Sequence, residues 1–282
     1  MKLVRFGEEG HERPGLVDGQ GVVRDLSSLV SDIAGTALAP ESLRRLSAVA
    51  ISSLPAVSHP VRLGACVSGV GKIVCVGLNY HGHIREIGAT APTEPVLFMK
   101  SATSICGPND SVKVPPGATA VDWEVELGVV IGSRATRVTV ETALAHIAGY
   151  CIVNDVSERD WQLKGTGQWV KGKSADTFAP LGPWLVTADE LLDPQSLNVQ
   201  LKLNDEVQQV GTTQDMVFGV AQIVSYVSRF MTLVPGDVLS TGTPAGVGMG
   251  KKPPRFLKPG DVMELSIDRL GSQRQRVIDT PG

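Results

Sequence analysis

The chain has 282 residues, of which 42% are apolar and 20% charged, and its formal net charge is −3. A chain of this length can bury a large core. Its slight negative charge argues against nucleic acid as a partner, because nucleic-acid-binding domains carry clustered basic residues. No apolar run is long enough to span a membrane, and the first residues lack the apolar core of a secretory signal. The four cysteines include no Cys-x-x-Cys pair and fit reduced, mostly buried thiols. We therefore expect a cytoplasmic protein without a membrane or nucleic-acid partner.

The first part of the chain has the pattern of a small α/β domain. The elements expected there are a strand at Lys2–Phe6, a hairpin of Gly15–Val17 and Val22–Leu26 around a Gly-rich turn, and a helix around Pro40–Ala50. Residues 51–71 are rich in Ser, Pro and Gly, which is typical of a linker or a surface connection. We predict that residues 1–66 form a small N-terminal domain and residues 67–282 the main domain.

Residues 67–282 alternate short apolar runs with turns rich in Pro and Gly, which predicts a mostly β domain. The expected strands are Ile73–Val76, Val96–Met99, Val121–Ile131, Gly149–Val153, Trp184–Thr187, Leu197–Leu203, Val238–Ser240 and Val262–Ile267. One long helix is expected from Val217 to Met231, because its apolar residues recur at steps of three and four. The predicted fold class is α+β, with more strand than helix.

Three carboxylates occupy alternate positions at the start of the run Val121–Ile131. In an extended strand Asp122, Glu124 and Glu126 point to one face, where like charges repel. No Lys or Arg lies among them, whereas a divalent cation would relieve the repulsion, and oxygen ligands suit Mg²⁺, Mn²⁺ or Ca²⁺. An acidic strand face in water would show the same pattern. However, the run continues with apolar residues on both faces, which is typical of a central strand.

A further aspartate and a His–Glu pair are candidates for the same site. Asp155 ends an apolar strand and precedes Ser157–Asp160, which has the pattern of a helix start with a capping box. An ordinary turn aspartate would fit there as well. His83 and Glu86 are three residues apart in a helix-like segment, so their side chains can touch, as a general base that activates water requires. A surface ion pair is the alternative for these two residues.

Six motifs, in order from Ile73 to the C-terminus, resemble the fumarylacetoacetate hydrolase superfamily. They are Gly77-Leu-Asn-Tyr80 with His83-x-x-Glu86; Pro95-Val-Leu-Phe-Met-Lys100; Glu124-x-Glu126-Leu-Gly128; Asn154-Asp155-Val-Ser-x-Arg159; Gly172-Lys173-Ser-x-Asp176; and Pro235-Gly-Asp with Thr241-Gly-Thr-Pro. The resemblance implies a β-roll catalytic fold, usually as a homodimer. It also implies Mg²⁺ or Mn²⁺ bound by Glu124, Glu126 and Asp155, and water activated by His83 and Glu86.

The resemblance also implies residues that act on the substrate. Lys173, with Arg159 and Gln162, is expected to bind substrate oxygens and stabilise negative charge, and Thr243 to help hold a carboxylate. The tail from Gly248 to Gln275 resembles bacterial members that hydrolyse 2,4-diketo-3-deoxy sugar acids such as L-2,4-diketo-3-deoxyrhamnonate.

The predicted reaction is therefore hydrolysis of a C–C bond in a small 2,4-diketo acid, either an acylpyruvate or a diketo-deoxy sugar acid, with release of pyruvate. The alternatives on the same metal site are a ureidoglycolate lyase, an oxaloacetate-type decarboxylase and a hydroxymuconate-type isomerase. A catalytically silent metal-binding or scaffold protein is the alternative outside the enzymes. The presence of both His83 and Glu86 favours hydrolysis.

Overall fold

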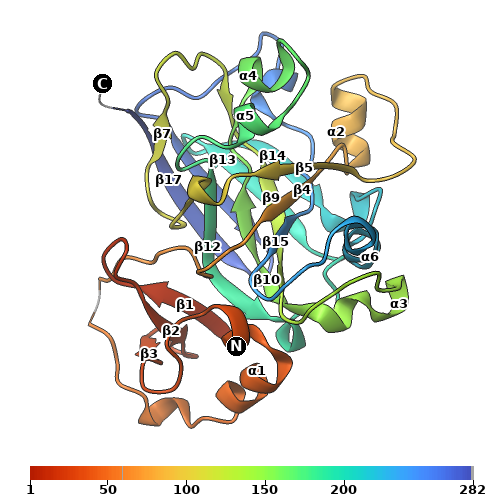
Figure 1. Cartoon of the computed structure of the whole chain (residues 1–282). Coiled ribbons are helices and arrows are strands. Elements are labelled where there is room, and N and C mark those ends of the chain that lie inside the picture. Colours follow the sequence, from red (N-terminus) through yellow and green to blue (C-terminus); the bar gives the residue numbers. More distant parts are fainter. Residues whose placement is uncertain (59, 281–282) are drawn as a thin grey trace.

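The computed structural model describes residues 1–58 and 60–280 and is built around β-sheets (Figure 1). In this described part the largest sheet has ten strands. Nine of them run in the order β3 (Val23–Asp25), β2 (Arg13–Val17), β1 (Lys2–Phe6), β12 (Ala179–Thr187), β10 (Ile147–Asn154), β9 (Val125–Ile131), β15 (Val238–Ser240), β4 (Ile73–Gly77) and β5 (Val96–Lys100). The tenth, β6 (Ile105–Cys106), pairs with β12.

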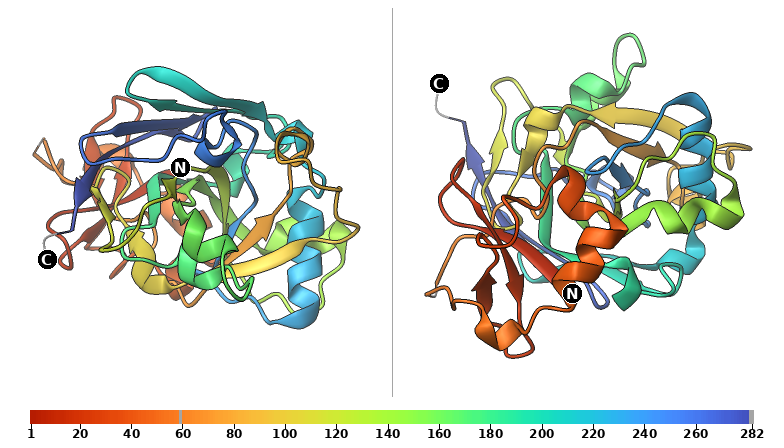
Figure 2. Two further views of the ribbon diagram at one scale, coloured as in Figure 1. Left: turned by 90° about the horizontal axis from the view of Figure 1, so that it is seen from above. Right: turned by 60° about the horizontal axis from the view of Figure 1, so that its bottom comes forward.

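A second sheet covers one face of the first, and its teal and blue strands lie along one side of the molecule in Figure 2, left. Its order is β14 (Glu206–Thr212), β13 (Asn198–Leu203), β16 (Val262–Ile267), β17 (Gly271–Asp279) and β7 (Val112–Val114), and a separate short pair joins β11 (Ser157–Glu158) to β8 (Val121–Asp122). The α-helices are α1 (Pro40–Ser47), α2 (His81–Glu86), α3 (Val140–Ala143), α4 (Arg159–Leu163), α5 (Val170–Lys173) and α6 (Val220–Phe230). Strands thus predominate, which confirms the predicted α+β class. Across the described residues, none of the helices has the length and apolar character needed to cross a membrane.

Strand β9 is buried on both faces, as its apolar run predicted. On one face Val125 and Leu127 belong to the larger apolar cluster, together with Leu201 and Leu265 of the second sheet. On the other face Val130 belongs to a second cluster. Burial of apolar area on both faces fixes the register of β9, and a shift by one residue would exchange its apolar residues and its glutamate between the two faces.

The N-terminal segment lies at one end of the molecule and is connected to the larger sheet (Figure 1). Strand β1 pairs with β12 through Lys2 opposite Val186 and Leu3 opposite Leu185. Leu3 and other N-terminal leucines belong to the same apolar cluster as Val130. The division into residues 1–66 and 67–282 stays a prediction, and expression of residues 67–282 alone would test it.

The predicted strand Val121–Ile131 is interrupted, so this prediction was wrong in part. Asp122 ends β8 and Val125 begins β9. Between them the backbone N–H of Trp123 donates to Asp122 Oδ1 at 2.8 Å, and that of Glu124 donates to Asn154 Oδ1 at 3.3 Å. These side-chain oxygens accept the hydrogen bonds that a neighbouring strand would otherwise accept. The chain therefore leaves the sheet next to the acidic residues.

Two predicted helix starts were also wrong, one by three residues and one by a single residue. Helix α6 begins at Val220 instead of Val217, because the N–H groups of Val217 and Phe218 donate to the backbone and side-chain oxygens of Asn79, both at 2.8 Å. Helix α4 is capped by Glu158, whose carboxylate accepts from Trp161 N at 2.6 Å, and not by a Ser157 capping box.

Candidate metal centre and active site

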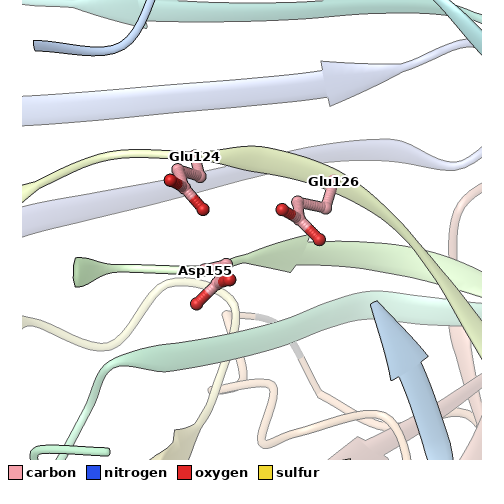
Figure 3. Close-up of side chains that lie close together, drawn as sticks. All are labelled: Glu124, Glu126 and Asp155. Atoms are coloured by element: carbon pink, nitrogen blue, oxygen red, sulfur yellow. The ribbon is translucent and has the colours of Figure 1, made fainter. Parts of the chain in front are cut away.

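The three predicted metal ligands lie together. Strands β9 and β10 are antiparallel neighbours with Val153 opposite Glu126, and Asp155 N donates to the backbone oxygen of Glu124 at 2.9 Å. Asp155, just past the end of β10, therefore lies beside Glu124. Figure 3 shows Glu124 and Glu126 pointing from one segment toward the side where Asp155 lies. Each side chain is buried, and each offers one oxygen such that the three oxygens lie within 4.8 Å of one another.

Three cations from other parts of the chain reach these carboxylates. Lys173 Nζ lies 2.7 Å from Glu124 Oε2 and 2.9 Å from Asp155 Oδ2, and Lys100 Nζ lies 2.6 Å from Asp155 Oδ1. Arg159 Nη2 lies 2.7 Å from Glu124 Oε1. The acidic run itself contains no Lys or Arg, and the cations that pair with it come from β5, α4 and α5.

Glu126 differs from its neighbours because its donors are uncharged. Both the hydroxyl of Ser240 at 2.6 Å and the N–H of Gly242 at 2.8 Å donate to its Oε2. Burial and the nearby carboxylates of Asp155 and Glu124 raise the pKa of Glu126 well above its ordinary value. A divalent cation would favour the ionised form of Glu126. Three buried carboxylates, one of them without a cationic partner, fit a hard divalent ion that takes oxygen ligands.

The pKa of Glu124 shifts in the opposite direction. Burial alone would raise it, but the charges of Lys173 and Arg159 outweigh burial and hold the pKa below its ordinary value. The pKa of Lys173 is raised, since its attraction to Asp155 and Glu124 outweighs the effect of burial. Glu124 is thus ionised and Lys173 protonated at neutral pH. Lys173 is therefore a fixed positive charge at this centre.

The expected contact between His83 and Glu86 is present on α2. His83 Nδ1 lies 3.0 Å from Glu86 Oε2, and the two side chains are only 9% and 16% exposed, which excludes a solvated surface pair. The other oxygen of Glu86 accepts from Gly246 N at 2.8 Å, so the carboxylate is held in place. Because Nδ1 is directed to the carboxylate, the proton belongs on Nδ1 and Nε2 is the nitrogen that can accept another.

Arg159 is positioned by Asp122, the third acid of the predicted face. Asp122 Oδ2 accepts from Arg159 Nε at 2.8 Å, and Arg159 Nη1 donates to Gln162 Oε1 at 2.9 Å. Asp122 also accepts from the N–H groups of Gly248 at 2.7 Å and Met249 at 3.0 Å. Asp122 therefore anchors the arginine and does not belong to the carboxylate cluster.

One small cavity joins most of the predicted site residues. The seven that line it are His83, Glu124, Glu126, Arg159, Gln162, Lys173 and Thr243, and Glu86 and Asp155 bond to members of that lining. Its volume is about 80 Å³, several times the ~10–15 Å³ that one water needs. The cavity therefore suits a small ligand. The hydroxyl of Thr243 donates to Val125 O and accepts from Gln209, so it is already used within the protein.

Sequence reasoning missed Lys100 as a member of this centre and missed the contact by which Asp122 anchors Arg159. The sequence feature that could have identified Lys100 is its position at the end of an apolar strand. In the structure its side chain is directed into the protein beside Asp155. Asp122 was seen as one of three like acids. Only the tertiary contact with Arg159 separates its position from that of Glu124 and Glu126.

Comparisons with known proteins show the family to which this chain belongs. The model of the fumarylacetoacetate (FAA) hydrolase C-terminal family matches residues 72–278. A protein of Burkholderia cenocepacia described as a hydrolase is 54% identical over 280 residues, which is 99% of each chain. The solved structure of a fumarylacetoacetate hydrolase from Exiguobacterium antarcticum is 38% identical, covers 99% of this chain and 100% of that chain, and has a TM-score of 0.88.

A more distant solved relative contains a metal and a small keto acid. It is a maleylpyruvate hydrolase from Sphingobium sp. SYK-6 in complex with manganese(II) ion and pyruvate, 29% identical over 100% of both chains, with a TM-score of 0.83. Matching solved structures also include a 5-carboxymethyl-2-hydroxymuconate delta-isomerase. The relatives thus include hydrolases and isomerases. With the family model matched over most of its length, the chain belongs to the fumarylacetoacetate hydrolase family.

Proposed function

We propose that this chain is a divalent-metal-dependent hydrolase that cleaves the C3–C4 bond of a small 2,4-diketo acid, either an acylpyruvate or a diketo-deoxy sugar acid. Water adds to the C4 carbonyl, the bond between C3 and C4 breaks, and the products are pyruvate and the carboxylic acid derived from the acyl group. The observation that carries this proposal is that His83, paired with Glu86, lines the same small cavity as Glu124 and Glu126 of the three clustered carboxylates. The relative that binds manganese and pyruvate supports it.

Glu124, Glu126 and Asp155 would hold Mg²⁺ or Mn²⁺. When bound, the ion supplies a Lewis acid that favours negative charge on the keto oxygen of the substrate. Lys173 and Arg159 act in the same direction, because they are buried positive charges fixed in place before the reaction begins. Their ion pairs hold them at the cavity without a conformational change.

The proton transfers are assigned to α2. His83 Nε2 takes a proton from water, and the oxygen attacks C4. Glu86 keeps the imidazole in the required tautomer and stabilises the imidazolium that forms. The electron pair of the broken bond stays on the pyruvate half, near Lys173 and Gln162, and C3 then takes the proton back from the His83 imidazolium to give pyruvate.

An isomerase or a decarboxylase on the same centre is the second candidate, since the solved relatives include an isomerase. Neither reaction needs an attacking water. Neither reaction would therefore use His83 and Glu86 to activate water, so the presence of this pair favours hydrolysis. A ureidoglycolate lyase would need hydrogen-bond donors and acceptors that bind the ureido group of its substrate.

The test is to incubate purified protein with Mg²⁺ or Mn²⁺ and a panel of acylpyruvates and diketo-deoxy sugar acids, and to follow pyruvate with lactate dehydrogenase. We expect pyruvate and the second acid in equal amounts, and no activity after removal of the metal with EDTA. Absence of pyruvate from every member, together with conversion of ureidoglycolate to glyoxylate, would overturn the hydrolase proposal.

The homodimer stays a prediction that light scattering would test.

A further inference from the structure

The lining of the cavity is divided into a polar part and an apolar part. Seven apolar side chains belong to the lining: Val76, Leu78, Ile87, Phe98, Leu163, Trp169 and Met249. The polar side chains are deeply buried, with Lys173 only 1% exposed. Leu163 is 50% exposed and Trp169 is partly exposed, so part of the apolar side lies toward solvent. A ligand whose charged end reaches the carboxylate cluster therefore extends past apolar side chains.

The order of these side chains from the centre outward follows from their contacts. Lys173 bonds to the carboxylates, and its Nζ lies 4.9 Å above the ring of Phe98. Phe98 in turn contacts the ring of Trp169 edge to face, with centroids 5.3 Å apart. Trp169 is thus two contacts away from the carboxylate cluster.

The position of Trp169 is fixed by Gly77. A Cβ on Gly77 would lie 2.6 Å from the indole ring, so the ring packs directly against the backbone of β4. Trp169 also immediately precedes α5, which carries Lys173. The apolar wall is therefore part of the same packed unit as the charged centre. Leu163, at the end of α4, lies four residues after Arg159 and so on the same side of that helix.

Among the described residues that line the cavity, the cations already have partners. Arg159 pairs with Asp122 and Glu124, and Lys173 pairs with Glu124 and Asp155. A second carboxylate at the far end of a substrate would lose part of its hydration against the apolar wall and would find no unpaired cation among these lining residues, whereas an apolar group would remove apolar area from water. A chain of hydroxyl groups would likewise lose hydrogen bonds to water over the part of the wall that it covers.

We infer that the substrate is a 2,4-diketo monocarboxylic acid whose distal group is a short, uncharged, apolar acyl chain, selected by a wall of Trp169, Leu163 and Phe98. This inference rests on the proposed function and narrows its substrate class. The wall discriminates against substrates that end in a second carboxylate or in a polyhydroxylated chain. Leu163 is the specificity-determining residue at the exposed end of this wall.

The kinetic test compares 2,4-dioxoheptanoate with 2,4-dioxoheptanedioate, which have the same chain length and differ only in a terminal methyl or carboxylate group. We expect kcat/KM to be at least tenfold higher for the methyl compound. It should also exceed that of 2,4-dioxopentanoate by about fourfold for each added methylene that contacts the wall. Equal or better cleavage of the dicarboxylate, or of a 5,6-dihydroxylated analogue, would overturn the inference.

A binding test decides the inference even if none of these compounds is cleaved. The non-cleavable acids 2-oxohexanoate and 2-oxohexanedioate are titrated by calorimetry in the presence of Mn²⁺, and we expect the monocarboxylate to bind at least tenfold more tightly. Failure of cleavage with this preference intact would refute the proposed hydrolysis alone. Binding without preference would refute the apolar wall alone.

Two matched variants assign the preference to the wall. Leu163→Arg places a cation at the exposed end of the cavity, and we expect the ratio of methyl to carboxylate binding to fall at least tenfold. Leu192→Arg makes the same change at a leucine that is 85% exposed and outside the cavity lining, and we expect the wild-type ratio. The same ratio in both variants would show that Leu163 does not contact the distal group and would overturn its assignment.

Discussion

Replacement of Asp122 by asparagine tests the ion-pair network most directly. In the structure Asp122 Oδ1 accepts from the N–H groups of Trp123 and Gly248. Its Oδ2 accepts from Arg159 Nε and from the N–H of Met249. Asparagine keeps one acceptor oxygen, but its NH₂ group would replace the other and would face two donors. Asp122→Asn therefore leaves two donors without an acceptor and removes a charge beside a buried guanidinium.

The expected loss of stability follows from the broken ion pair and the two unpaired donors. Breaking a buried ion pair costs about 3–5 kcal/mol, and the low end applies here because Glu124 still pairs with Arg159. We expect the free energy of unfolding in urea to fall by about 3 kcal/mol. The control Asp189→Asn, at an exposed aspartate, should change it by less than about 0.5 kcal/mol. A loss for Asp122→Asn no larger than that of the control would refute the anchoring role.

Three further predictions concern the dyad, the metal and a close backbone contact. His83→Ala should lower hydrolysis by about a hundred- to ten-thousand-fold while calorimetric Mn²⁺ affinity stays unchanged; weaker metal binding would contradict the assignment. Glu126→Gln should abolish the stabilisation of about 2.7 kcal/mol expected at a Mn²⁺ concentration one hundred times Kd. In EDTA the variant should gain stability over wild type as the pH rises above 4.5, because the pKa of Glu126 is raised in the folded state; an unchanged difference across pH would contradict this. Gly248→Ala should destabilise by about 1–3 kcal/mol, since its Cβ would lie 2.0 Å from the backbone oxygen of Arg255, whereas Gly19→Ala meets no atom within 4 Å and should be nearly neutral in the same urea assay.

The carboxylates of the centre were predictable because their arrangement is local. Glu124 immediately precedes the apolar strand β9, and Glu126, two residues later, lies within it. Asp155 follows β10, the apolar strand that pairs with β9. Period-two alternation is sufficient to place the first two on one face. The cations were not predictable in the same way. Lys100 and Lys173 lie far from the acids in sequence, and only the packing of β5 and α5 brings them into contact.

Strand β17 was missed for a different physical reason. Its inward positions include Gln273 and Gln275, which are fully buried polar residues, so hydrophobic alternation does not reveal the strand. Gln273 Nε2 donates to the backbone oxygens of Ile152 and Gly182, at 2.8 Å and 3.0 Å. Buried glutamines that satisfy backbone carbonyl groups are stable in a core, yet no sequence pattern distinguishes them from surface glutamines.

Strand β14 was missed because most of its residues are polar or exposed. The turn before it gave a usable signal, since Asn204 and Asp205 both have positive φ, at 50° and 67°, and connect β13 to β14. Two such residues between strands are typical of a tight hairpin. Turn chemistry was therefore more informative than hydrophobicity at this edge of the second sheet.

The charge balance of the buried network links the metal, the substrate and the apolar wall. Its members are the carboxylates of Asp122, Glu124, Glu126 and Asp155 and the cations of Lys100, Arg159 and Lys173. While no cation is bound, the raised pKa of Glu126 favours its neutral form, and the other three carboxylates then balance the three cations. A divalent cation together with ionised Glu126 would bring the net charge to +1, and a keto acid with one carboxylate would bring it to zero. A second carboxylate would give a net charge of −1, and it would lie against the apolar wall, where it loses part of its hydration without gaining a cationic partner. Charge balance and the apolar wall thus favour the same substrate class, a diketo acid with one carboxylate.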